Sequence, residues 1–362
     1  MMKTNLLNPP YLYSSLTRIA DLQVRPFDVI SLPQKEWETG DYVVGEVLSP
    51  VPVNPKLELP NGRLASLLEG DRIIGAFGIR RATLEAVGEW QSIGEDGRMD
   101  NMTCAGLFGK VTSKSYLLPP LTSLQYQGHV MRNGEKVSMK GFVPTIPHRN
   151  YECPTIMIIG TSMSAGKTTS GRIIVHQLKQ LGLKVVAAKL TGAGRYRDVL
   201  SMGDAGADFI FDFVDVGLPS SVAPPEEFRV LVRQLLSMMA TKKPDVVVVE
   251  AGASPLEPYN GSVVLEELKP HICLTVLCAS DPYSVVGVCQ GFGFLPDLVT
   301  GIATSTSSGV ELVKKLTGIP ALTLSEPGSL VILTQLLKDK LGLTGEVPHP
   351  TPLRVGLPTL KN

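Results

Sequence analysis

The pattern of hydrophobic and polar residues changes near residue 150 and divides the chain into two parts. Before this point, short apolar runs alternate with glycine-rich turns, as in residues 40–47, 70–78 and 105–111. Short strands separated by turn residues are typical of a small sheet or barrel rather than of βαβ units. The pattern therefore predicts a smaller β-rich domain over residues 1–150, with a small barrel as one possible form and substrate or partner binding as its role.

The second part of the chain alternates strand-like and helix-like patterns after a proline-containing linker at residues 143–154. Alternation of this kind predicts a mostly parallel sheet flanked by helices, which makes residues 151–345 an α/β domain. Residues 346–362 form a proline-rich tail. The expected strands cover residues 155–159, 184–188, 245–249, 272–278 and 321–324, and the expected helices cover about residues 168–181 and 309–316.

A glycine- and serine-rich segment connects the first expected strand to the first expected helix. Residues 160–169 read Gly-Thr-Ser-Met-Ser-Ala-Gly-Lys-Thr-Thr. A strand before and a helix after are the context that identifies a P-loop, although this loop has five residues between its first glycine and Gly-Lys, where the common form has four. The small residues allow backbone amides to surround phosphate oxygens, and the helix N-terminus adds partial positive charge. The motif predicts binding of ATP by Gly160, Thr161, Ser162, Ser164, Ala165, Gly166, Lys167, Thr168 and Thr169.

Within this motif, Lys167 is expected to reach the β- and γ-phosphates, and Thr168 is expected to offer its hydroxyl to Mg²⁺. Two more charged residues end apolar runs. Glu250 follows four valines, and Lys189 follows residues 184–188. Ligands of open α/β sheets bind at the carboxyl ends of strands, so we expect Glu250 to act as a metal ligand or general base and Lys189 to neutralise a substrate carboxylate or the transferring phosphoryl group. The alternatives are a helix-capping acid and a solvent-exposed lysine.

Other polar segments leave several readings open. Arg195 and Arg197 follow a glycine turn and either clamp an anion or lie on the surface. Arg80 and Arg81 follow a strand-like run and are better explained by solvation of a strand edge. Residues 301–309 follow an expected late strand and are candidates for contact with the base.

The motifs resemble dethiobiotin synthetase and the related ATP-dependent amidoligases that make cobyrinic acid amides, over roughly residues 155–341. The resemblance rests on five features: the five-residue loop spacing, the strand that ends in Lys189, the pair Asp204-Ala205, the turn that begins at Glu250, and the proline-rich segment at residues 218–225. This half of the chain is also similar to an uncharacterised P-loop family with variable N-terminal domains. The resemblance implies Mg²⁺ held by Thr168, Asp204 and Glu250, catalysis by Lys167, Lys189 and Glu250, and a homodimer. Spacing alone does not choose Asp204 over Asp198, Asp208, Asp212 and Asp215.

Composition narrows the expected partners. Lys plus Arg and Asp plus Glu are equal at 34 each, so a nucleic acid or an anionic membrane is not expected as a partner. The five cysteines form no Cys-x-x-Cys pair and are expected to be free thiols of a reducing compartment. No stretch reaches the roughly 18 apolar residues of a membrane-spanning helix, and no signal peptide is recognised, so a cytoplasmic location is expected.

Together these features predict an ATP- and Mg²⁺-dependent, ligase-like enzyme that activates a small carboxylate or carbamate by phosphoryl transfer. The first 150 residues have no counterpart in dethiobiotin synthetase, so the resemblance does not identify the substrate. A small-molecule kinase shares the first step. A nucleotide-driven switch or metallochaperone is the alternative from another class, and a nucleotide sensor without turnover is a further one. No Asn-Lys-x-Asp sequence for guanine recognition is present, and the sequence leaves ATP against GTP open.

Overall fold

The computed structural model describes residues 11–52, 55–252, 254–293 and 295–343. The chain forms two compact units. The first unit comprises residues up to Thr145 together with two later segments, Ala193–Arg197 and Phe213–Val222. The second unit comprises the remaining residues, beginning at Ile146. The predicted tail at residues 346–362 lies outside the described residues.

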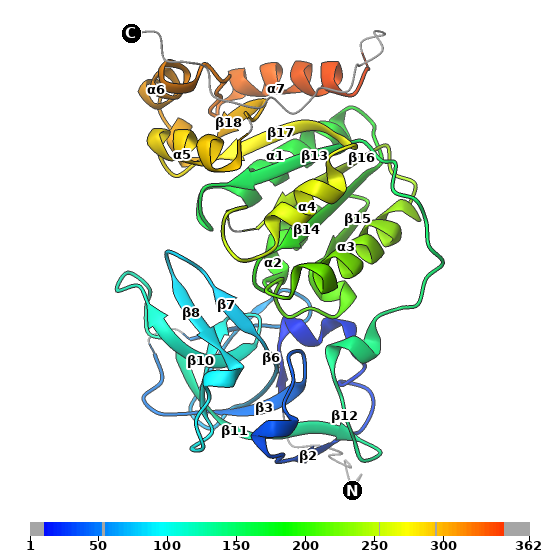
Figure 1. Cartoon of the computed structure of the whole chain (residues 1–362), viewed down its shortest axis with the longest axis vertical. Helices are drawn as coiled ribbons and strands as arrows, with labels where there is room; N and C mark the ends of the chain where they lie inside the picture. The colour runs from blue at the N-terminus through cyan, green and yellow to red at the C-terminus, as the bar shows by residue number, and fades with distance from the viewer. Residues whose placement is uncertain (1–10, 53–54, 253, 294, 344–362) are drawn as a thin grey trace, which may run out of the picture. The chain divides into compact units, whose positions relative to one another are not determined.

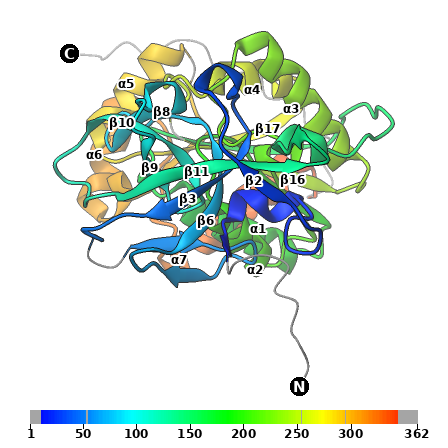
Figure 2. The ribbon, with the colours of Figure 1, turned by 90° about the horizontal axis from the view of Figure 1, so that it is seen from below.

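The first unit is built around five strands whose pairings form a closed ring, β6–β3–β11–β9–β10 and back to β6. All of these pairs are antiparallel except β10 with β6. Figure 2 shows these strands in blue to teal. Their bounds are Tyr42–Val47 for β3, Arg72–Phe77 for β6, Arg98–Thr103 for β9, Leu107–Lys114 for β10 and Thr122–Arg132 for β11.

Apolar side chains from these strands and from the adjoining loops fill the core of the first unit, as burial of about 25 cal/mol per Å² of apolar surface favours. The rings of Trp37 and Phe77 are stacked with centroids 4.8 Å apart. The shorter strands around the ring are β1 (Tyr11–Tyr13), β2 (Asp28–Ile30), β4 (Lys56–Glu58), β5 (Leu64–Ser66), β7 (Ile79–Arg81), β8 (Ala86–Glu89) and β12 (Glu135–Lys136). The 3₁₀ helices are η1 (Ser15–Ile19), η2 (Gln34–Glu36), η3 (Trp90–Ser92), η4 (Met139–Phe142) and η5 (Phe213–Val216).

The second unit contains a six-stranded, wholly parallel sheet in the order β15-β14-β16-β13-β17-β18. Its central strands are buried along their whole length, which explains the runs of consecutive valines. The strands are β13 (Thr155–Gly160), β14 (Val185–Thr191), β15 (Phe209–Asp212), β16 (Val246–Ala251), β17 (Ile272–Cys278) and β18 (Leu298–Thr300).

Five helices connect the strands of this sheet: α1 (Lys167–Gln180), α2 (Tyr196–Asp204), α3 (Pro225–Ala240), α4 (Gly261–Leu268) and α5 (Pro282–Phe292). The last strand, β18, is followed by the 3₁₀ helix η6 (Ile302–Thr304) and by α6 (Ser307–Thr317) and α7 (Pro327–Lys340). Because α1 and α4 lead to strands in opposite directions along the sheet, right-handed crossovers put them on opposite faces. Figure 1 shows α3 and α4 side by side in front of the sheet. None of the helices in the described residues has the length and apolar character needed to cross a bilayer.

The expected fold class, an α/β domain with a mostly parallel sheet after a β-rich domain, is confirmed. One expected strand is wrong. Residues 321–324 form no strand, and Ala321 makes only an isolated bridge to Val299. The edge strand is instead β18, which is three residues long and too short to show a period in the sequence.

Candidate functional site

The glycine-rich loop lies where the strand order of the sheet reverses. β13 lies between β16 and β17, and the chain leaves β13 through the loop and α1 to reach β14 on the far side of β16. Later, α4 leads from β16 across to β17. Ligands of open α/β sheets bind at such a point, outside the carboxyl ends of the strands. The position of the loop therefore agrees with a ligand-binding role.

The loop folds around its own lysine. Lys167 is the first residue of α1, is only 2% exposed, and its Nζ donates to the carbonyl oxygen of Ser162 at 2.6 Å. A Cβ on Gly160 would meet Lys167 Nζ at 2.8 Å, so a larger residue at this position would require the lysine side chain to shift. Gly166 precedes the helix with a φ of 102°, a conformation that glycine adopts without steric cost. The residue types required by the motif are thus explained by close approach and by backbone conformation.

Two neighbouring segments support the loop. The amide of Thr161 donates to Cys278 at the end of β17, and its hydroxyl accepts from the amide of Ser280 at 3.0 Å. Gly301, after β18, lies so close to the loop that a Cβ there would be 2.3 Å from the carbonyl oxygen of Ala165. The segment at residues 301–309, expected near a base, therefore begins beside the loop. Ser164 and Thr169, two other predicted loop residues, are exposed.

Thr168 connects the loop to the neighbouring strand β16, because its hydroxyl donates to Glu250 Oε2 at 3.1 Å. Glu250 is the fifth residue of β16 and is only 3% exposed. A hydroxyl and a carboxylate are both oxygen ligands, which is the chemistry that Mg²⁺ prefers. The structure thus brings together two of the three residues expected around the metal.

Charged side chains also line up across three neighbouring strands. Lys189 on β14 is paired in register with Asp212 on β15 and with Glu250 on β16. Residues in register on parallel strands project from the same face, and all three are at most 3% exposed. A further carboxylate comes from the first turn of α2, where Asp198 Oδ2 accepts from Lys189 Nζ at 2.6 Å. The site therefore holds a lysine surrounded by three carboxylates beside the P-loop.

Burial and mutual charge set the protonation of this group. Burial alone favours a neutral Lys189, but the carboxylates of Asp198 and Glu250 outweigh it, so the pKa of Lys189 is raised and the side chain stays an ammonium. Burial, and then the charge of Asp198, raise the pKa of Glu250. Burial lowers the pKa of Lys167, against the attraction of Glu250. Desolvated charges of this kind are characteristic of sites that bind or transform charged ligands.

Asp204, the third expected metal ligand, is not brought to this group. It is exposed at the C-terminal end of α2, six residues and roughly 9 Å along the helix axis from Asp198. The carboxylate that α2 supplies to the site is Asp198. Five aspartates lie in this region of the sequence. Only a prediction that a helix begins directly after Arg195 could have favoured Asp198 over the other four. Asp212 was likewise identifiable only as the end of a short strand.

The arginines that the sequence suggested as anion-binding residues lie in the segments counted with the first unit. Arg80 and Arg81 form ion pairs with Glu85 and Glu89 inside the first unit, and Arg80 also donates to a backbone carbonyl. Arg195 and Arg197 are both exposed in the segment counted with the first unit. The structure therefore gives Arg80 and Arg81 intramolecular partners.

No family model matches the chain, and no curated protein matches it in sequence. Similar solved structures include HypB from Helicobacter pylori in complex with nickel, which is 16% identical, with 55% of this chain and 92% of that chain covered and a TM-score of 0.36. Chloroplast FtsY from Physcomitrella patens is 16% identical, with 54% and 70% covered and a TM-score of 0.36. A DUF1611 family protein from Anabaena variabilis is 17% identical, with 52% and 58% covered and a TM-score of 0.36. At this level of likeness the comparisons carry no information on activity.

Proposed function

We propose that this chain is a Mg²⁺-dependent P-loop enzyme that binds a nucleoside triphosphate and transfers its γ-phosphoryl group. The observation that carries the proposal is the contact between Thr168 and Glu250 next to the buried Lys167, at the reversal of strand order. A loop of small residues, a buried ammonium and a pair of hard oxygen ligands are the features that phosphoryl transfer needs, because its catalysis is mostly positioning and charge neutralisation.

The residues present fit a nucleotide and a metal. Lys167 and the loop amides would hold the phosphates, and Thr168 with Glu250 would hold Mg²⁺ directly or through water. The metal, when bound, offsets the negative charge that gathers on the phosphate oxygens during transfer. Lys189 lies in the same row as Glu250 and stays charged, so it adds a second cation to this edge of the sheet. We take ATP as the expected substrate, as the sequence resemblance implies, and include GTP in the test.

The presence of Lys189 favours a small acidic molecule, a carboxylate or carbamate, as the acceptor of the phosphoryl group. Hydrolysis of the nucleotide requires only the loop, its lysine and the metal ligands. A further buried ammonium, Lys189, can neutralise the negative charge of an acceptor close to the phosphates. This reading makes the enzyme ligase-like, with an acyl phosphate formed first. The bond from the γ-phosphorus to the bridging oxygen breaks as the bond to the carboxylate oxygen forms, and the nucleoside diphosphate leaves. A second nucleophile then attacks the acyl carbon, the bond from that carbon to the phosphate oxygen breaks, and inorganic phosphate leaves.

The test is a phosphate-release and nucleotide-product assay with Mg²⁺, run with ATP and with GTP, against a panel of small carboxylic acids with and without amines. Lys167→Ala, which removes the phosphate-binding ammonium, is the matched inactive control. We expect diphosphate formation that one class of acid stimulates in the wild type and that is lost in the variant. Formation of AMP would overturn the phosphoryl-transfer step. Turnover that no acid changes would instead favour the nucleotide-driven switch, with water as the acceptor.

A further inference from the structure

Three large apolar side chains protrude from two adjoining loops of the first unit. Leu84 lies in the turn between β7 and β8, and Tyr116 and Leu117 lie in the connection from β10 to β11. Their exposed fractions are 67%, 91% and 76%. β8 and β10 are antiparallel neighbours, as Figure 1 shows, and the amide of Ser115 donates to the carbonyl oxygen of Glu85. The two loops therefore meet, and we call Leu84, Tyr116 and Leu117 the apolar tip.

The backbone of the loop that carries Tyr116 and Leu117 satisfies several of its own polar groups. The amide of Leu117 donates to Ser115 Oγ at 3.3 Å, and the amide of Leu118 donates to the carbonyl oxygen of Ser115 at 3.1 Å. Residues 119 and 120 are both proline and have no N–H group. The ammonium of Lys114 donates to the carbonyl oxygen of Leu118 at 2.6 Å. Because an unpaired polar group is costly in a medium poor in water, these bonds favour contact of the loop with such a medium.

The charge beside the apolar tip is positive, although the charge of the whole chain is balanced. Residues 101–134, which include the connection from β10 to β11, contain Lys110, Lys114 and Arg132 and no Asp or Glu. The adjoining hairpin of β7 and β8 adds no net charge, because its two arginines pair with its two glutamates. Lys110 and Lys114, both on β10, therefore give the surroundings of the apolar tip a net positive charge. An anionic partner is favoured for this reason.

We propose that the apolar tip docks on the surface of an anionic lipid bilayer. Side chains exposed to this extent protrude, so they can enter a fluid bilayer without a complementary groove on the partner. Tyr116 suits the interfacial layer, because its ring is apolar and its hydroxyl stays hydrated. The two lysines on β10 attract the acidic headgroups. Docking requires neither nucleotide nor Mg²⁺, so it goes beyond the proposed phosphoryl transfer and is independent of it.

The experiment is co-sedimentation of the full chain with lipid vesicles in the absence of nucleotide. The vesicles consist of phosphatidylcholine alone or of an equal mixture of phosphatidylcholine and phosphatidylserine. The variants are a double substitution, Tyr116→Ser with Leu117→Ser, and the single substitution Lys110→Gln. Leu68→Ser is the matched control, because Leu68 is a leucine of the same unit that is 69% exposed and is followed by the acidic Glu69. The Tm of each protein is measured as a check on folding.

We expect the wild type and Leu68→Ser to bind the mixed vesicles equally, and the double variant to bind them about tenfold more weakly or less, with an unchanged Tm. Lys110→Gln should weaken binding to the mixed vesicles about fivefold and leave the weaker binding to phosphatidylcholine alone unchanged, since only acidic headgroups attract the ammonium.

No binding of the wild type to the mixed vesicles would overturn the proposal, and so would equal binding of the wild type and the double variant. Sedimentation velocity without vesicles tests contact between copies of the chain. Self-association of the wild type that the double variant abolishes, without vesicle binding, would assign the apolar tip to such a contact and overturn docking on lipid.

Discussion

The hydroxyl of Thr168 donates to Glu250 at 3.1 Å and joins the first turn of α1 to the carboxyl end of β16. One of the two groups is a hydroxyl and the other a carboxyl group, so both offer oxygen ligands. The contact accounts for why an acid follows the valine run of β16. It also makes the metal dependence of turnover the most direct test of the site.

Glu250→Gln and Thr168→Ala should each raise the Mg²⁺ concentration required for half-maximal turnover by about tenfold or more, because the first replaces a carboxylate ligand with a neutral amide and the second removes a hydroxyl ligand. The measurement is a Mg²⁺ titration of phosphate release at saturating nucleotide. Glu311→Gln, an exposed acid on α6, is the control and should follow the wild type. A Glu250→Gln titration that overlays the wild-type curve would remove Glu250 from the metal site.

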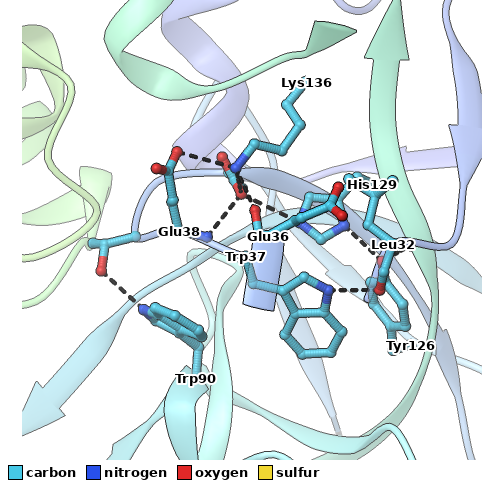
Figure 3. Close-up of polar contacts among 10 residues, drawn as sticks. Leu32, Glu36, Trp37, Glu38, Trp90, Tyr126, His129 and Lys136 are labelled. Carbon is cyan, nitrogen blue, oxygen red and sulfur yellow. Dashed lines mark hydrogen bonds and ion pairs between the residues drawn. The ribbon is translucent and has the colours of Figure 1, made fainter. Parts of the chain in front are cut away.

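A second prediction concerns the stability of the first unit. Asp41 is 1% exposed, and its Oδ2 lies 3.2 Å from His129 Nε2 and 2.9 Å from Lys136 Nζ. Figure 3 shows the side chains of His129, Lys136 and Tyr126 in this region. His129 is also bonded through Nδ1 to the hydroxyl of Tyr126. Asp41→Asn replaces a buried carboxylate with a neutral amide beside the partly exposed Lys136 ammonium, so it should lower the free energy of unfolding by about 1–3 kcal/mol.

Urea unfolding, followed by tryptophan fluorescence, measures this loss, since both tryptophans lie in this unit. Glu38→Gln is the matched control, because Glu38 also contacts Lys136 but is 74% exposed. Its substitution should leave the unfolding midpoint unchanged, as expected for an exposed ion pair. A destabilisation by Glu38→Gln equal to that by Asp41→Asn would show that burial does not decide the strength of these contacts.

The sequence was sufficient for the P-loop, because its small residues are dictated by local backbone geometry and by the neighbouring lysine. It was also sufficient to place Lys189 and Glu250, since an apolar run that ends in a charge indicates the carboxyl end of a buried strand. It could not select Asp198. The first two amides of α2 donate to Glu58, and no local pattern encodes a contact across 138 positions. The choice of Asp204 followed a resemblance in sequence order, whereas the helix carries that residue away from the other charges.

The buried thiols give a prediction with a defined pH range. Burial raises the pKa of Cys278 to about 12 and those of Cys273 and Cys289 to about 11, above the value of 9.0 for a free thiol. In the native state these thiols stay protonated where the unfolded chain ionises, so their contribution to stability is complete below pH 9 and is lost as the pH rises toward 11 to 12.

The protection of these thiols is tested by alkylation of the native protein, followed by mass spectrometry of its peptides. At pH 8, Cys278 should be modified only at the rate of global unfolding, while the half-buried Cys153 reacts faster. The unfolding midpoint in urea should fall steadily above pH 9. Rapid modification of Cys278 in the native protein would show that the thiol beside Ser170 is reached by solvent through local opening.

The contact between Gly301 and the P-loop leads to the last prediction. Gly301 has a φ of 93°, and an added Cβ would be 2.3 Å from the carbonyl oxygen of Ala165, a backbone atom that cannot turn aside. Gly301→Ala should therefore displace the loop and raise the nucleotide KM about tenfold or more. Gly318→Ala is the control for backbone strain without displacement of the loop. Gly318 also has a positive φ, of 69°, but no atom lies within 4 Å of an added Cβ. Both substitutions impose a positive φ on alanine and should lower stability, by roughly 1–2 kcal/mol at the left-handed Gly318 and by roughly 1–3 kcal/mol at Gly301, whose ψ is −153°. Only Gly301→Ala should change the KM. Equal KM values in the two variants would show that the loop does not depend on its packing against Gly301.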